Sequence, residues 1–204
     1  MSNPATRHGQ GIKELMRYLR SIVKQKIRYG PGGEDHNDHF VIYTDADWAS
    51  DVTDRKSLSG GVGMFYGGPF CWMSRKQRCV ARSSCESEYI SQSTYAMQGQ
   101  WAAQIFRDFS MPEYIGSNSK TVDMRGDIQG AIALVKNPQL HERSKHIDVC
   151  YHHIRDLSEK GKLKIEYIPT ADIPADGLTK PLTRIAFERF KNQLGITHES
   201  VVSR

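Results

Sequence analysis

Cysteine is scarce in this chain of 204 residues, which contains only Cys71, Cys79, Cys85 and Cys150. None of them forms a Cys-x-x-Cys pair, and this excludes a zinc ribbon and a dithiol redox motif. In a reducing cytosol such cysteines serve as small core or surface residues.

Long apolar runs are also missing. No stretch approaches the length of a membrane span, and the first eight residues lack the apolar segment of a secretory signal. We therefore expect a cytoplasmic, intracellular protein with no membrane partner. Internal repeats and low-complexity segments are absent as well, and the length suits one compact α/β domain with tails.

A uniformly basic surface is not indicated, although the net charge is +5 and the isoelectric point is near 9.0. Residues 1–30 carry seven lysines and arginines against one acid, Glu14, so the rest of the chain is close to neutral. Contacts with a polyanion must therefore come from this N-terminal arm or from local basic patches.

Hydrophobic periodicity predicts one main domain between two appendages. Apolar residues recur at helical spacing over 9–25, with basic residues on the other face, and a Gly-Pro-Gly-Gly segment ends this arm. We assign residues 1–33 to a basic helical arm, 34–182 to the α/β domain, and 183–204 to a C-terminal helix and tail.

Within the domain the pattern predicts a mixed five-stranded sheet that begins with three antiparallel strands and has helices on both faces. The expected strands are 40–44, 61–66, 70–74, 121–124 and 163–168. The expected helices are 84–109, 129–136, 146–160, 173–179 and 184–194.

Four acidic residues lie at the ends of these elements: Asp45, Glu88, Asp127 and Asp176. If the fold brings them together, the carboxylates repel one another unless divalent cations neutralise them. Two magnesium ions about 4 Å apart would clamp the attacking and leaving oxygens of a phosphodiester, as in many nucleases. Taken singly, each acid has an ordinary explanation as a cap or turn residue.

Neighbouring acids compete for two of these places. Asp47 would share the side of Asp45 if the strand continued. Glu86 and Glu88 cannot share one site, because residues two apart on a helix point in nearly opposite directions. Ser83 and Glu86 match a capping box, which gives Glu86 a structural role. Glu88 is then the acid that is available to a cleft where the four carboxylates would meet.

The third acid also has a rival. Asp127 follows a strand and opens a helix, where backbone N–H groups favour a carboxylate, while Asp123 lies inside the same strand. Asp176 lies in the first turn of the helix that Pro174 opens.

Six short motifs run in order along nearly the whole chain. They are Tyr-Thr-Asp-Ala-Asp-Trp-Ala-Ser-Asp (43–51), Asp-Arg-Lys-Ser (54–57), Ser-Ser-Cys-Glu-Ser-Glu-Tyr (83–89), Gln-Gly-Ala-Ile-Ala-Leu-Val-Lys-Asn-Pro (129–138), Ser-Lys-His-Ile-Asp (144–148) and Ala-Asp-Gly-Leu-Thr-Lys-Pro-Leu (175–182). Together they resemble the ribonuclease H domain of copia-type long-terminal-repeat retrotransposon Pol polyproteins. The N-terminal helix resembles the end of the reverse transcriptase that precedes this domain.

The resemblance implies a ribonuclease H-like fold with catalytic and metal-binding acids at Asp45, Glu88, Asp127 and Asp176. It implies hydrolysis of the RNA strand of RNA-DNA hybrids with two Mg²⁺ ions, for which Mn²⁺ substitutes, and no small-molecule cofactor. The implied partners are the hybrid and the reverse transcriptase domain of the same polyprotein. The implied setting is a retrotransposon particle.

Recognition of a hybrid would use phosphates and RNA 2′-hydroxyl groups, so little base specificity is expected. The best local basic patch for these contacts consists of Arg75, Lys76, Arg78 and Arg82, which a solvated strand-to-helix edge explains equally well. The isolated chain is expected to be weakly active, because a polymerase would supply most phosphate contacts.

Two alternatives remain open. Ile128, Gly130 and Gly177 depart from the family pattern beside the third and fourth acids, and no His shortly precedes Asp176. An inactive relic or connection-type module that binds a template-primer duplex would tolerate these changes. A polynucleotide integrase or transposase shares the fold, but it uses three acids rather than four.

A zinc site is a competing interpretation of one helix. His146, Cys150 and His153 fall on one helical face, with His141 nearby. The family pattern matches His146 and His152 but neither Cys150 nor His153, which favours a structural role for His146.

Overall fold

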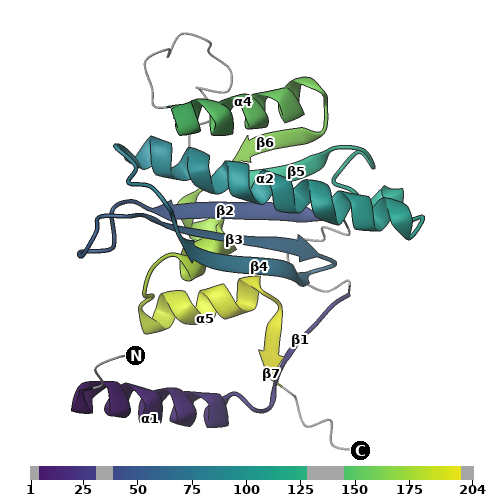
Figure 1. Cartoon of the computed structure of the whole chain (residues 1–204). Helices are drawn as coiled ribbons and strands as arrows, with labels where there is room; N and C mark the ends of the chain where they lie inside the picture. The colour runs from purple at the N-terminus through teal and green to yellow at the C-terminus, as the bar shows by residue number, and fades with distance from the viewer. Residues whose placement is uncertain (1–4, 31–38, 128–144, 199–204) are drawn as a thin grey trace, which may run out of the picture.

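A mixed five-stranded sheet forms the centre of the computed structural model, which describes residues 5–30, 39–127 and 145–198 (Figure 1). Its strands lie in the order β4-β3-β2-β5-β6. Their bounds are β2 (Val41–Asp47), β3 (Leu58–Phe65), β4 (Gly68–Lys76), β5 (Val122–Gly126) and β6 (Leu163–Tyr167). The first three along the chain pair antiparallel, and β5 pairs parallel to both β2 and β6. The predicted mixed sheet is confirmed.

Helices cover both faces of this sheet, also as predicted (Figure 1). On one face lie α2 (Ser84–Asp108) and α4 (Lys145–Glu159), which pack against each other. On the other face lie two short 3₁₀ turns and a helix: η2 (Thr170–Asp172), η3 (Pro174–Leu178) and α5 (Arg184–Gln193). A further 3₁₀ turn, η1 (Pro112–Tyr114), follows α2.

Strand β2 separates two apolar cores because its side chains alternate between the faces of the sheet. Ile42, together with Phe40 just before the strand, belongs to the larger core beneath α2 and α4. Val41 and Tyr43 belong to the smaller core, where Ile173 of the η2–η3 segment packs. The strand is therefore buried from both sides, which fixes its carboxyl end relative to the helices around it.

The N-terminal arm forms α1 (Thr6–Ser21) and β1 (Gln25–Ile27). None of the α1 residues is buried, although the ring of Tyr18 contacts that of Phe187 in α5. Strand β1 pairs antiparallel with β7 (Ile196–His198), so the two ends of the described chain meet in a second, small sheet. The domain boundaries at residues 33 and 182 stay a prediction.

The predicted helix at 173–179 is shorter than expected, since η3 is a 3₁₀ turn. Gly177 explains its close packing: a Cβ atom there would lie 2.6 Å from the ring of Phe190. The helix predicted at 129–136 lies outside the described residues. Among the helices that are described, none has the length and apolarity that a membrane crossing requires.

Candidate active site

The carboxyl end of β2 carries the first acid. Strand β2 continues through Asp47, so Asp45 and Asp47 lie on the same side of the sheet, as the sequence suggested. Parallel pairing places Thr44 beside Gly126 at the end of β5, and Asp127 follows directly. The carboxyl ends of two parallel strands thus bring Asp45 and Asp127 to one edge.

Helix α2 brings the second acid to this edge from the side. Ser83 caps the helix, since its hydroxyl accepts a hydrogen bond from the backbone N–H of Glu86 at 3.2 Å. The carboxylate of Glu86 in turn accepts the backbone N–H of Arg82 at 3.1 Å, which confirms its structural role. Glu88 is 8% exposed and lies two residues further on, on the other side of the helix. It is more deeply buried than a residue open to a cleft would be.

A buried amide fixes this helix against the sheet. Gln77 follows β4, and its Nε2 donates to the hydroxyl of Ser59 at 2.9 Å and to the carbonyl of Ser87 at 2.7 Å. Ser87 precedes Glu88 in the chain. The bonds of Gln77 therefore couple the position of Glu88 to strands β3 and β4.

The fourth acid reaches the site on η3, which packs directly on β3. Gly60, the partner of Asp45 in the β2–β3 register, makes this approach possible. A Cβ atom at Gly60 would lie 2.9 Å from the carbonyl oxygen of Ala175 and 2.5 Å from a methyl group of Thr179. Asp176 lies between these two residues in the chain, so its place depends on this glycine.

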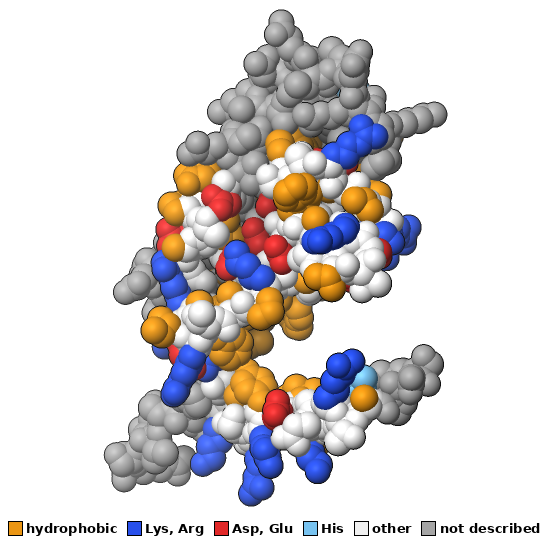
Figure 2. All heavy atoms as spheres, turned by 90° about the vertical axis from the view of Figure 1, so that its left-hand side faces the viewer, with side chains coloured by type: hydrophobic (Ala, Val, Ile, Leu, Met, Phe, Trp, Pro, Cys, Tyr) orange, Lys and Arg blue, Asp and Glu red, His pale blue; other side chains and the backbone are white. Residues whose placement is uncertain are grey.

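The four predicted acids affect one another electrostatically. Burial raises the pKa of Glu88 to about 9, and the charges of Asp45 and Asp127 contribute to the rise. Burial also raises the pKa of Asp45, with a further contribution from the charge of Asp176. Acidic side chains gather in the middle of this face of the molecule in Figure 2. The fold thus brings the sequence-predicted acids into one neighbourhood, which stays a candidate site.

Three of these acids have partners that the sequence reasoning missed. The hydroxyl of Thr179 donates to Oδ2 of Asp45, and the hydroxyl of Thr170 donates to Oδ2 of Asp127. The ammonium group of Lys180 forms an ion pair with Oδ1 of Asp176. Thr179 and Lys180 belong to the motif at 175–182 and follow Asp176 closely, a signal that could have identified them.

The donor set suits a hard divalent cation, because every predicted ligand atom is a carboxylate oxygen. Oε2 of Glu88 is buried and has no hydrogen-bond partner among the described residues, so a cation would satisfy it. Within the described ranges, however, no three His, Cys, Asp or Glu side chains converge closely enough to hold one ion. A cation therefore requires some carboxylates to turn away from their present partners.

Asp123, the rival of Asp127, lies at the opposite end of β5. It is 2% exposed, and its carboxylate accepts the backbone N–H of Ser117 at 2.8 Å. Nε2 of His39 lies 3.3 Å from the same oxygen, Oδ2. These contacts give Asp123 a structural role away from the acidic edge.

The predicted basic patch lies along the same edge as the acids. Register places Asp47 beside Leu58 and Leu58 beside Lys76. Because adjacent strands lie about 4.8 Å apart, the backbone of Lys76 is about 10 Å from that of Asp47. Lys76 forms ion pairs with Asp51 at 2.8 Å and Asp54 at 3.1 Å. The other patch residues are exposed: Arg75, Arg78 and Arg82.

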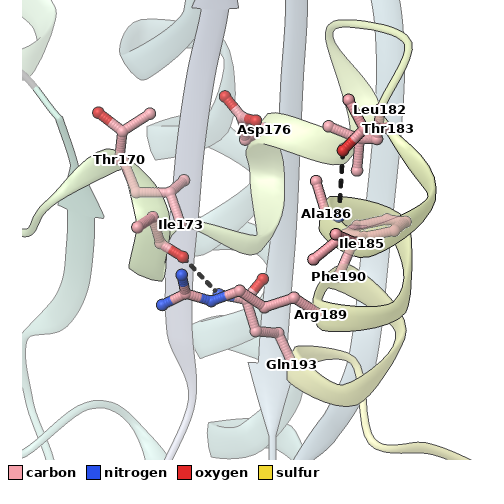
Figure 3. Close-up of a pocket in the computed structure, with 12 residues that line it drawn as sticks. Thr170, Ile173, Asp176, Leu182, Thr183, Ile185, Ala186, Arg189, Phe190 and Gln193 are labelled. Atoms are coloured by element: carbon pink, nitrogen blue, oxygen red, sulfur yellow. Dashed lines mark hydrogen bonds between the residues drawn. The ribbon is translucent and has the colours of Figure 1, made fainter.

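A hollow of about 450 Å³ opens beside the fourth acid. Figure 3 shows Asp176 on the η3 turn at one side and α5 at the other. Its lining combines apolar side chains such as Ile173 and Phe190 with the polar side chains of Thr170 and Gln193. The hollow thus lies between the η2–η3 segment and α5.

The zinc interpretation gains no support from α4. Nδ1 of His153 lies 3.3 Å from the hydroxyl of Ser93 on α2, so this histidine joins the two helices. Cys150 is half-buried and unpaired. His141 and the side chain of His146 lie outside the described residues, and the described ones form no metal-binding cluster.

Solved structures identify the class of fold. A ribonuclease H1 obtained from compost by a metagenomic approach superposes with a TM-score of 0.51 and 15% identity, over 70% of this chain and 93% of the other. The chain therefore has the ribonuclease H-like fold that its motifs predicted. No family model matches the sequence.

Curated relatives identify the family. The retrovirus-related Pol polyprotein from transposon TNT 1-94 of Nicotiana tabacum is 37% identical over 196 residues, and that from transposon RE1 of Arabidopsis thaliana is 34% identical over 197. These alignments cover 96% and 97% of this chain but only 14% and 13% of the relatives. The chain is homologous, over almost its whole length, to one segment of copia-type retrotransposon Pol polyproteins.

Proposed function

We propose that the protein hydrolyses the RNA strand of RNA-DNA hybrids during retrotransposon reverse transcription. The observation that carries the proposal is that Asp45, Glu88, Asp127 and Asp176 lie in one neighbourhood at an edge of a ribonuclease H-like sheet, where their charges act on one another. The homology to Pol polyproteins supports the same function. Cleavage within the RNA strand makes the protein an endoribonuclease, and its proposed setting is an intracellular retrotransposon particle.

Two Mg²⁺ ions, or Mn²⁺ in their place, would supply the hydroxide nucleophile and stabilise the leaving 3′ oxygen when bound. Asp45 and Asp127 would hold them from the ends of the two parallel strands, and Glu88 and Asp176 would close the site from either face of the sheet. Glu88 would contribute its Oε2 oxygen, which is buried and has no hydrogen-bond partner among the described residues.

Substrate contacts would extend from this site along the basic patch. A hybrid phosphate backbone that passes the acids at the end of β2 would meet Arg75 near the end of β4 and Arg78 just after it, on the same edge. Arginine contacts to phosphates position a duplex without reading its bases. This supports cleavage with little sequence preference.

The proposed reverse transcriptase partner would dock on α1. The apolar face of this helix is exposed, with Leu15 at 55% and Met16 at 61%. Helices with such a face usually bury it against another surface, because exposed apolar patches are unfavourable in water. A polymerase domain joined to the arm would cover this face and add phosphate contacts, so the isolated chain would act weakly.

Binding without cleavage is a second candidate, favoured by one observation. The carboxylates of Asp45, Asp127 and Asp176 already have partners within the chain, and among the described residues no three acids converge on one point. A module that holds a template-primer duplex needs no such convergence.

Cleavage of a hybrid with a labelled RNA strand, in Mg²⁺ or Mn²⁺, distinguishes the two functions. We expect cleavage by the full chain, no cleavage by Asp45→Asn, and normal cleavage by Asp156→Asn. Asp156 is an exposed acid of α4 that pairs with Lys160, so it controls for the loss of one charge. Hybrid binding without cleavage at any metal concentration would refute the proposed enzyme and support the binding module.

A further inference from the structure

The ammonium group of Lys180 lies within the acidic edge. Its ion pair with Asp176 joins residues four apart in the chain, and the side chain of Asp176 is only 19% exposed. The charge of Lys180 also acts on Asp45 and on Glu88. One lysine thus serves several carboxylates that belong to separate elements of the fold.

The electrostatics of Lys180 itself agree with this position. Partial burial lowers the pKa of Lys180, but the hydrogen bond and charge of Asp176 outweigh it, and the overall pKa is raised. Asp45 and Asp47 contribute to the rise. The ammonium group is therefore held as a cation among four acidic side chains, where a divalent ion would otherwise be the nearest positive charge.

We propose that Lys180 is an internal counter-ion of the acidic cluster, which stabilises the metal-free protein and competes with the divalent cation for Asp176. This inference rests on the metal site of the proposed function. Carboxylates gathered at one point repel one another, and an ammonium group among them relieves this repulsion. A divalent cation at Asp176 would meet the ammonium group at the same carboxylate, and the repulsion between the two positive charges favours departure of the ammonium group.

The side chain can leave without disturbing the fold. Lys180 is 43% exposed, and its flexible stem lets the ammonium group turn into solvent. Thr179, the preceding residue, remains anchored by its hydrogen bond to Asp45. Lys180 is accordingly a positioning residue, which sets the threshold for metal binding without touching the reacting atoms.

The test compares the full chain with Lys180→Met and Lys180→Arg. Manganese affinity is measured from the electron paramagnetic resonance signal of free Mn²⁺, and thermal unfolding is measured in chelator and in Mg²⁺. For Lys180→Met we expect roughly 3- to 10-fold tighter Mn²⁺ binding, from the loss of one partly screened charge. Its unfolding temperature falls in chelator and rises more on addition of Mg²⁺ than that of the unsubstituted chain. Lys180→Arg keeps the charge and restores the original affinity.

Lys160→Met is the matched control. Lys160 also pairs with an aspartate four residues earlier, Asp156 at 2.7 Å, but both side chains are exposed. The Lys160→Met variant should therefore bind Mn²⁺ with unchanged affinity. Unchanged or weaker Mn²⁺ binding by Lys180→Met would overturn the counter-ion role, since Lys180 would then serve the substrate or help to form the metal site. Failure of the unsubstituted chain to bind either metal would overturn the two-metal function as well.

Discussion

The hydroxyl of Thr179 donates a hydrogen bond to Oδ2 of Asp45, although the two residues are 134 positions apart in the chain. This bond joins the last motif of the sequence to the first. Asp45 lies at the end of β2, and Thr179 lies directly after η3, the turn that carries Asp176. The first and fourth acids are therefore held together by a side chain that belongs to neither.

Removal of this hydroxyl should weaken both the fold and the site. Thr179→Val keeps the shape of the side chain but leaves a buried carboxylate without its donor, so we expect a loss of about 1 to 3 kcal/mol in the free energy of unfolding. Urea denaturation measures it. Thr170→Val removes the equivalent donor to Asp127 at an exposed position and should cost less than about 1 kcal/mol. Equal losses in the two variants would contradict the special role of Thr179.

The stability of the metal-free protein should fall as pH rises. Burial first, and then the charge of Asp45, raise the pKa of Glu88 from its ordinary 4.5 to about 9. The folded chain therefore holds a proton that the unfolded chain releases, and the stabilisation present below pH 4.5 is lost progressively toward pH 9. Thermal unfolding in chelator from pH 5 to pH 8 measures this trend.

Glutamine at position 88 should remove much of that dependence. Glu88→Gln stays neutral, so at pH 8 in chelator we expect it to be about 1 to 3 kcal/mol more stable than the unsubstituted chain. Glu86→Gln is the control two residues away. This substitution replaces the carboxylate that caps the start of α2 with a neutral amide, so it should lower the free energy of unfolding by about 0.5 to 1 kcal/mol. A destabilising Glu88→Gln would show that Glu88 is ionised in the metal-free fold.

An added methyl group at Gly60 should displace η3. The Cβ atom of Gly60→Ala would overlap with Ala175 and Thr179, and overpacking of this kind costs about 1 to 3 kcal/mol. Because Asp176 moves with η3, hybrid cleavage should fall roughly 100-fold. Gly9→Ala in α1 adds the same methyl group where nothing lies within 4 Å, and it should reduce neither stability nor cleavage. Unreduced cleavage by Gly60→Ala would show that activity does not depend on the close packing on β3 of η3, which carries Asp176.

The basic patch should contribute unevenly to hybrid binding. Joint replacement of Arg75 and Arg78 by alanine should weaken binding and reduce the dependence of log affinity on log salt concentration by about 0.9 for each lost phosphate contact. Lys76→Ala should have a smaller effect, because Asp51 and Asp54 already neutralise Lys76. Fluorescence anisotropy of a labelled hybrid at several salt concentrations measures both, with Lys160→Ala as the control. An unchanged salt dependence in the double variant would place the hybrid elsewhere.

Local chemistry made part of this structure predictable. The cap that Ser83 and Glu86 form at the start of α2 involves residues close in sequence, so its geometry follows from helix spacing alone. The same spacing distinguished Glu88 from Glu86 before any tertiary contact was considered. The mixed sheet followed from short apolar runs and from the family motifs.

The pairing of distant segments was decided only by the tertiary structure. Strands β1 and β7 are three residues each and carry no period from which to predict them, yet they pair across nearly the whole chain. The sequence by itself determined which acids could form a site, because their order and context are local. The fold decided how the first acid is held: Thr179 reaches Asp45 because η3 packs on β3, and packing between remote elements leaves no local signal.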